Sequence, residues 1–246
     1  MDILYLVTFI VTFIASILSG IAGGGVGFVT TPFWLAIGLS PAQGGAAGAF
    51  MSTGMSISAI TAFRKSGHFP KDKKLLTILS ITTLLAAILG VIIVPTIDIN
   101  LFKYTLAVIT ILALPLLFIK SRHPFHFGKH PRIGITLAIL LLVVGSIITS
   151  SVFSILFTIV LMAFFGLSVL QTTAMKRLLY FVQSVVLLVG FTISGYLVWQ
   201  HAVAGFLGGT LGAYIGTKYA VKKGETFAKY ALAATSLAGA IILLVQ

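Results

Sequence analysis

The sequence predicts an all-α integral membrane protein with about ten hydrophobic helical segments. We expect two inverted five-segment repeats, with the first two segments of each repeat short or broken. Composition is the first reason: 59% of the 246 residues are hydrophobic and 8% are charged, against roughly 25% charged in a soluble domain. Apolar runs recur along the whole chain, and matching motifs link its two halves. A multi-pass protein of the cell (plasma or inner) membrane follows, with the lipid bilayer as its surroundings.

The segments follow one another with short loops between them. Their approximate bounds are 2–19, 26–38, 42–63, 75–94, 101–119, 133–149, 152–165, 170–196, 201–219 and 227–245. The first lacks a basic leading region, so we read it as part of the mature protein. Segments 26–38 and 152–165 reach only about 20 Å at 1.5 Å per residue, which is short of a ~30 Å hydrocarbon core. Each therefore forms a hairpin with the segment before it, and the sequence leaves open whether these hairpins cross or re-enter.

Basic residues gather in some loops and are missing from others. Loops 64–74, 120–132 and 218–229 are basic, whereas loops 95–100 and 195–201 carry no lysine or arginine. Cytoplasmic loops of membrane proteins are enriched in these residues, so the first three are predicted inside and the last two outside. The net charge of +12 is explained in this way, and we expect no nucleic-acid partner.

Two stretches of the chain repeat each other at a nearly constant offset. Gly38–Ser40 with Gln43 matches Gly166–Ser168 with Gln171. Further matches follow in register: Phe63 and Ser66–Gly67 with Phe191 and Ser194–Gly195, Ala87 and Gly90 with Ala213 and Gly216, and Lys103–Tyr104 with Lys229–Tyr230. Because matched loops have opposite charge character, the halves are predicted to be inverted. We divide the chain into repeats 1–122 and 133–246, joined by a basic cytoplasmic linker 123–132; the alternative is a duplication with a structural role only.

The glycine-rich run Gly20–Gly27 is the sharpest local motif. Glycines expose backbone N–H groups, and at a helix start such groups are unpaired and lie at the positive end of the dipole. Irregular backbone is tolerated inside a membrane only within protein or against water. Gly23, Gly24 and Gly25 are therefore candidate anion ligands. The alternative is close helix packing through small residues.

Hydroxyls and one cationic pair complete the candidate binding site. The repeat partner of the glycine run is Thr149, Ser150 and Ser151, and Ser52, Thr53 and Ser56 share a face of segment 42–63. These hydroxyls either bind substrate or bond within their own helices. Lys176 and Arg177 stand inside segment 170–196, where Arg177 is a candidate ligand. Snorkelling of both cations to the membrane surface is the alternative.

The scarcity of acidic residues and the absence of cysteine limit the kinds of active site and metal site that the chain can form. The four acidic residues, Asp2, Asp72, Asp98 and Glu225, all fall at segment ends, and the chain has no cysteine. A carboxylate proton relay and a two-carboxylate active site are therefore disfavoured. The five histidines lie in loops or at segment ends without acidic neighbours, so no metal site and no cofactor are predicted. We expect no enzyme activity.

Several of these motifs together resemble the TauE/SafE (sulfite exporter) family. In the first half the resemblance rests on Gly20–Gly25, Pro32, Gly38–Pro41 and Arg64–Phe69, and in the second on Lys176–Phe181, Gly195–Trp199 and Gly208–Gly216. It covers nearly the whole chain. The chain departs from the family at Ala47–Gly48, where a Thr-Ser or Thr-Asn pair is common, and at Tyr180, often Asn. It departs again at Ser150–Phe153, where relatives often repeat the glycine block.

The resemblance implies a membrane transporter with sulfite or organosulfur anions as its best-known substrates. The sequence therefore predicts a secondary-type transporter that exports a small anion, most simply sulfite or a sulfonate. A passive anion channel is the alternative function, and a structural or partner-binding membrane protein is a further one. The sequence leaves homo-oligomerisation open.

Overall fold

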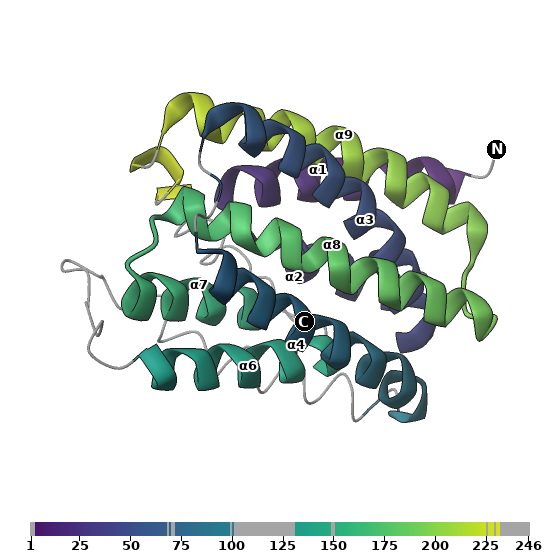
Figure 1. Ribbon diagram of the computed structural model, residues 1–246. Helices are drawn as coiled ribbons and strands as arrows, with labels where there is room; N and C mark the ends of the chain where they lie inside the picture. Colours follow the sequence, from purple (N-terminus) through teal and green to yellow (C-terminus); the bar gives the residue numbers. More distant parts are fainter. Residues whose placement is uncertain are drawn as a thin grey trace.

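The computed structural model describes residues 3–67, 69, 72–98, 100, 131–148, 151–224, 226–228 and 230–231, and this part of the chain is helical (Figure 1). Its helices are α1 (Ile3–Ala22), α2 (Gly27–Ala36), α3 (Pro41–Ser66), α4 (Lys73–Ile93), the short 3₁₀ helix η1 (Val94–Thr96), α6 (Pro131–Ile148), α7 (Ser151–Phe165), α8 (Val169–Ile193) and α9 (Trp199–Lys223). The predicted segments 101–119 and 227–245 lie largely outside the described residues.

The two long central helices begin with the same local structure. Ser40 caps α3 and Ser168 caps α8, and each serine side chain accepts a hydrogen bond from the backbone N–H three residues later. The glutamine at that position, Gln43 or Gln171, accepts from the cap's own N–H at 3.0 Å. This is a capping box, which satisfies two of the N–H groups that a helix start leaves unpaired. The motif that relates the two halves is therefore a pair of equivalent helix starts.

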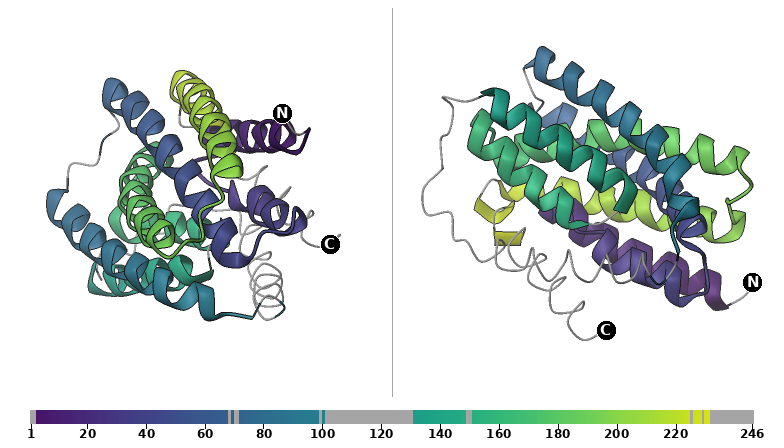
Figure 2. Two further views of the ribbon diagram at one scale, coloured as in Figure 1. Left: turned by 90° about the vertical axis from the view of Figure 1, so that its right-hand side faces the viewer. Right: turned by 90° about the horizontal axis from the view of Figure 1, so that it is seen from below.

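α3 and α8 pack against each other in opposite directions at the centre of the bundle. Phe63, near the end of α3, packs with Val169 and Leu170 at the start of α8. Phe191, near the end of α8, packs with Ala42 and Ala46 at the start of α3. α9 and α1 cover α3 on one side, and α4, α6 and α7 lie on the side of α8 (Figures 1 and 2).

Glycines allow two helix pairs to pack with their backbones in contact. A Cβ at Gly216 of α9 would collide with the carbonyl oxygen of Ile17 in α1. A Cβ at Gly90 of α4 would stand 2.9 Å from the carbonyl oxygen of Ser146 in α6. Gly216 and Gly90 occupy matching positions of the sequence repeat, so the α1–α9 and α4–α6 contacts are counterparts.

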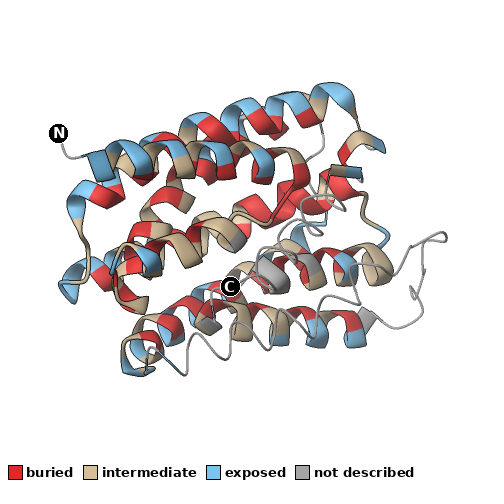
Figure 3. Cartoon of the chain, turned by 180° about the vertical axis from the view of Figure 1, so that it is seen from behind, coloured by how far each residue is buried: buried red, intermediate tan, exposed pale blue. Residues whose placement is uncertain are grey.

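The surface of the bundle is suited to lipid. Four helical stretches are long and apolar enough to cross a membrane: Ile3–Ala22, Pro41–Ser66, Lys73–Thr96 and Val169–Ile193. Large apolar side chains of α1, α4 and α9 are exposed on the outer faces, and the buried residues line the inner faces (Figure 3). The prediction of an all-helical protein with several membrane spans is confirmed for the described residues.

The first hairpin, α1 and α2, turns deep in the bundle and returns to the end at which it starts. The Thr8 hydroxyl of α1 lies 3.1 Å from His201 Nδ1 at the start of α9, and Trp34 at the end of α2 packs near Val198, just before α9. Both ends of the hairpin therefore lie at the same end of the bundle. The intervening turn lies deep, because Gly20 packs against Gly216. α2 has 10 residues, or about 15 Å, which is too short to span.

Basic residues gather at the opposite end of the bundle. Arg64 and Lys65 end α3, Lys73 and Lys74 begin α4, Arg132 is in the first turn of α6, and Lys218, Lys222 and Lys223 lie toward the end of α9. The end of α9 lies beside the end of α3 because these two helices run parallel. α4 and α6 begin at this same end, where Leu75 and Ala138 pack in one cluster with Met175 near the start of α8. One face of the bundle is thus strongly basic, as expected of a cytoplasmic face.

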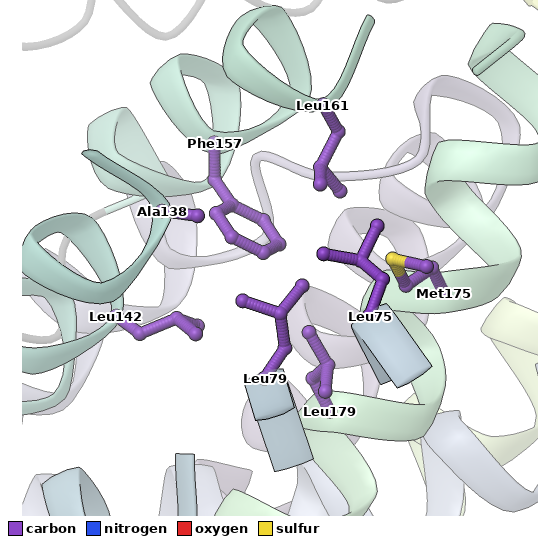
Figure 4. Packing of buried hydrophobic residues seen from close by; sticks show 8 residues of the cluster. All are labelled: Leu75, Leu79, Ala138, Leu142, Phe157, Leu161, Met175 and Leu179. Carbon is purple, nitrogen blue, oxygen red and sulfur yellow. The ribbon is translucent and has the colours of Figure 1, made fainter. Parts of the chain in front are cut away.

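A hydrophobic cluster joins the second hairpin to the rest of the molecule. Figure 4 shows it between four helices. Its members are Leu75 and Leu79 of α4, Ala138 and Leu142 of α6, Phe157 and Leu161 of α7, and Met175 and Leu179 of α8. Leu142 and Phe157 also face the internal cavity described next. The cluster therefore holds α7 in place beside that cavity.

Candidate functional site

A cavity of about 190 Å³ lies inside the bundle, between the two halves of the chain. The first half contributes the glycine turn with α2 and one face of α3. The second half contributes α6, α7 and one face of α8. The cavity therefore lies where the sequence repeat places an inter-repeat site.

Five of the predicted site residues line this cavity. They are Gly24, Gly25, Ser52, Ser56 and Arg177. Thr53 does not line it but donates a hydrogen bond of 3.0 Å to Ser184, which does. Thr149 and Ser150 lie outside the described residues. Ser151 begins α7, and its side chain also lies outside the described part.

Gly23 has a different position from the one predicted. It is not part of the cavity wall, and a Cβ there would collide with the Thr173 side chain. Its φ of 74° lies in the left-handed region, as does that of Gly25 at 95°, which L side chains rarely adopt. Its N–H donates to the Ser19 carbonyl at 2.9 Å. Gly23 therefore shapes the turn, and Gly24 and Gly25 face the cavity.

Two helix N-termini meet the cavity. α2 begins at Gly27, and the preceding residues Gly24 to Val26 line the wall with it. α7 begins at Ser151, and its first turn contributes Phe153 and Ser154. The first N–H groups of a helix have no intrahelical acceptor and carry the positive end of the helix dipole. The first turns of α2 and α7 therefore lie at the same cavity.

Arg177 brings a full positive charge to the cavity wall. The residue is only 4% exposed, and its Nη2 donates to the carbonyl oxygen of Ser19 at 3.1 Å and to the Ser19 hydroxyl at 3.2 Å. A guanidinium has five N–H donors. No acceptor for Nε or Nη1 occurs among the described residues. The remaining donors of Arg177 are thus available to a bound anion.

Lys176 lies beside the glycine turn, behind the cavity wall. It is 1% exposed. Its Nζ donates to the Thr158 hydroxyl at 2.7 Å, to the Ser154 hydroxyl at 3.2 Å and to the Ser154 carbonyl at 3.4 Å. A Cβ added at Gly24 would stand 3.4 Å from this Nζ. Snorkelling to the surface is therefore wrong for both cations, since both are buried within the bundle.

Acidic groups do not neutralise these cations in the described part of the chain. Asp72 is used as the N-cap of α4, where it accepts from the N–H of Leu75 at 2.9 Å. Asp98 accepts from the N–H of Asn100 in the loop that follows η1. No group of three or more potential metal ligands occurs among the described residues. Among the described residues, the cavity wall therefore has the cation Arg177 and no carboxylate.

Two polar residues of the site, Ser19 and Ser154, were missed by the sequence analysis. Ser19 and Ser154 hold the two cations, and Ser154 is also hydrogen-bonded to the Tyr180 side chain. Gln183 lines the cavity and donates to the Ser146 hydroxyl at 2.8 Å. The sequence offered one signal for the α8 wall of the cavity, which is helical spacing. Arg177, Tyr180 and Ser184 recur every three or four residues and therefore share one face of α8.

The two central helices contribute unequally to the cavity. At the repeat offset of 128 residues, Lys176 corresponds to Gly48, Arg177 to Ala49, and Tyr180 to Ser52. α8 thus carries charged and long polar side chains where α3 carries small ones. Space for a ligand comes from α3, and positive charge comes from α8.

A helical protein with several candidate membrane spans and an arginine on the wall of its cavity belongs to the class of integral membrane proteins. Comparison with protein families identifies it further. The family model "Sulfite exporter TauE/SafE" matches residues 8–243, so the chain belongs to this membrane transporter family. No curated protein and no solved structure matches the chain.

Proposed function

We propose that the protein is a secondary-type transporter that exports a small oxyanion, most simply sulfite or a small organosulfur anion such as a sulfonate. The observation that carries this proposal is the pair Lys176 and Arg177. Both cations are buried beside the glycine turn without a carboxylate partner among the described residues. Burial of an unpaired charge costs several kcal/mol, and removal of one partner of a buried pair is strongly unfavourable. A bound anion supplies the missing negative charge.

The anion is expected to bind between the glycine turn and Arg177. Gly24 and Gly25 bring the backbone close to it, and the start of α2 adds unpaired N–H groups. The free donors of Arg177 suit the oxygens of sulfite or a sulfonate, because a guanidinium binds oxyanions through parallel N–H bonds. Ser56 and Ser154 add hydroxyls to the same wall. Apolar side chains such as Phe153 and Leu187 complete the lining and suit a small organic tail.

The carrier mechanism rests on two inverted repeats, 1–122 and 133–246, joined by a cytoplasmic linker at 123–132. Three features support this division. The capping boxes of α3 and α8 are equivalent, Phe63 and Phe191 make reciprocal contacts, and Gly216 and Gly90 mediate matched helix contacts. Inverted-repeat transporters alternate access by moving one part against another around a central site.

Export from the cell is the direction that the membrane potential favours. A negative interior drives each negative charge outward by about 2.3 kcal/mol per 100 mV. The cavity lining found among the described residues contains no carboxylate, the group that commonly relays protons in transporters. The plasma or inner membrane is the expected location, with the basic face toward the cytoplasm.

Flux of labelled sulfite into proteoliposomes tests the function. We expect saturable flux that increases when a potential drives the anion across, and its loss in Arg177→Gln. Lys218→Gln is the matched control, because Lys218 lies at the surface near the Tyr214 ring and also loses one charge. Folded wild-type protein without flux above empty liposomes would exclude sulfite transport. Equal flux in Arg177→Gln and Lys218→Gln would remove Arg177 from the site.

A further inference from the structure

The indole of Trp34 contains a buried donor without a partner. Trp34 lines the cavity and is 2% exposed, and its Nε1 has no hydrogen-bond partner among the described residues. An indole N–H is a donor only. More than nine in ten buried polar groups are hydrogen-bonded, so an unpartnered one needs an explanation. An acceptor on a bound molecule would provide one.

Glycines hold the indole in a fixed place. A Cβ at Gly44 of α3 would stand 3.0 Å from Cβ of Trp34, and one at Gly205 of α9 would stand 3.3 Å from its Cη2. Trp34 therefore packs directly against glycines of two helices, where a Cβ would fit only if its neighbours shifted.

Gly48 leaves open space beside Nε1 of Trp34. A Cβ at Gly48 would have a single neighbour within 4 Å, which is Nε1 of Trp34 at 3.8 Å. Gly45, on the same helix, is different, because a Cβ there would stand 3.1 Å from the Phe191 ring. Gly45 is thus a packing glycine, whereas Gly48 lines the cavity beside the indole.

The Trp34–Gly48 position is separate from the cationic end of the cavity. The Thr53–Ser184 hydrogen bond joins α3 to α8 between them. Because the two helices are antiparallel, Gly48 lies on one side of this bond and Arg177 on the other. Gly48 also precedes Ser56 by eight residues, or about 12 Å along α3.

We propose that Trp34 and Gly48 form a second binding position for the transported anion. The Trp34 N–H donates a hydrogen bond to an oxygen of the anion, and the bare α-carbon of Gly48 leaves the space for that oxygen. The position lies toward the end of the bundle that is free of basic clusters. An anion moving between this end and Arg177 meets the indole donor on its way. This inference rests on the proposed transport of an oxyanion.

The indole resonances provide a direct test. The chain has two tryptophans, and the other, Trp199, is 58% exposed and lies outside the cavity lining. Protein labelled with ¹⁵N-tryptophan should give two indole N–H signals, and Trp199→Phe assigns them. Titration with sodium sulfite should shift the Trp34 signal and leave the Trp199 signal in place. An unchanged Trp34 signal at sulfite concentrations that saturate flux would overturn the proposal and leave the transport function standing.

Two variants test the same contact by different routes. Trp34→Phe removes the donor, and Gly48→Ala places a methyl group in the space before it at an ordinary packing distance. Each should raise the KM for sulfite flux about three- to tenfold, the value of one hydrogen bond. The double variant should be no worse than the poorer single variant, because both changes remove one interaction.

The outcomes separate the two proposals. Full additivity in the double variant, or an unchanged KM in Gly48→Ala, would overturn the Trp34–Gly48 position without affecting Arg177. Gly48→Ala keeps the test valid if Trp34→Phe fails to fold. Absence of saturable flux in the unaltered protein would overturn the transport function, and this inference with it.

Discussion

At the scale of single residues, two adjacent cations have different surroundings. Arg177 reaches the cavity wall and keeps donors free, whereas each donor of the Lys176 ammonium has an acceptor on α7. In the proposed function, Lys176 would therefore act on a bound anion through its charge and through the position of α7. Arg177 is suited to direct contact.

Lys176→Met is expected to weaken anion binding without removing it. Methionine has a similar length but no charge, and the loss of one nearby positive charge should raise the KM for sulfite about tenfold, equivalent to about 1.4 kcal/mol. The measurement is the concentration dependence of flux in proteoliposomes.

Lys222→Met is the matched control, because Lys222 lies in the last turn of α9 at the basic end. The control should keep the wild-type KM. An unchanged KM in Lys176→Met, with reduced thermal stability, would restrict Lys176 to a structural link between α7 and α8.

At the scale of elements, the capping boxes make α3 and α8 equivalent. Both helices start with a serine cap, a glutamine three residues later and a preceding glycine at positive φ, Gly38 at 87° and Gly166 at 64°. These motifs are local, so the sequence could predict them. They set the register of the faces that line the cavity.

Removal of either cap should have the same effect on stability. Ser40→Ala and Ser168→Ala are each expected to reduce the free energy of unfolding by about 1 kcal/mol, the usual value of an N-cap. The midpoints of denaturant-induced unfolding in detergent provide the measurement.

Thr61→Ala is the control for these two variants. The exposed Thr61 hydroxyl bonds only to the Ile57 carbonyl of its own helix at 2.8 Å, so little change is expected. A large difference between the two cap variants would show that the helix starts are not equivalent.

The sequence predicted elements better than contacts between them. The lengths of the described helices and the matching starts of α3 and α8 follow from hydropathy and local motifs. The rarity of charge inside a membrane singled out Arg177, which lines the cavity. Ser19 and Trp34 could not be predicted, because their roles depend on how α1 and α2 pack against distant helices. Gly23 was misplaced for the same reason, since only the packed structure shows Thr173 behind it.

At the scale of the whole molecule, the first hairpin and the basic face define a topology. Ile3 and Ala36 end the hairpin on the side without basic clusters, and Lys222 lies on the other side. Because the chain has no cysteine, single cysteine substitutions can report each position without background.

Membrane-impermeant thiol labelling of intact cells should therefore modify Ile3→Cys and Ala36→Cys but leave Lys222→Cys unmodified. Permeabilised cells, in which all three should react, provide the control for accessibility. Labelling of only one of Ile3→Cys and Ala36→Cys would mean that the hairpin crosses the membrane. Labelling of Lys222→Cys alone would reverse the orientation.

The unequal contributions of α3 and α8 have a consequence for direction. The two helices run in opposite senses, so a site built evenly from both would look the same from either side of the bilayer. Lys176 and Arg177 stand on one helix only, and the matching repeat positions of the other helix are Gly48 and Ala49. If the proposed orientation and function hold, an anion from the cytoplasm would meet the charge first, whereas one from outside would meet the indole and Gly48 first. The site would then differ between the two sides of the membrane even where the helix starts are equivalent.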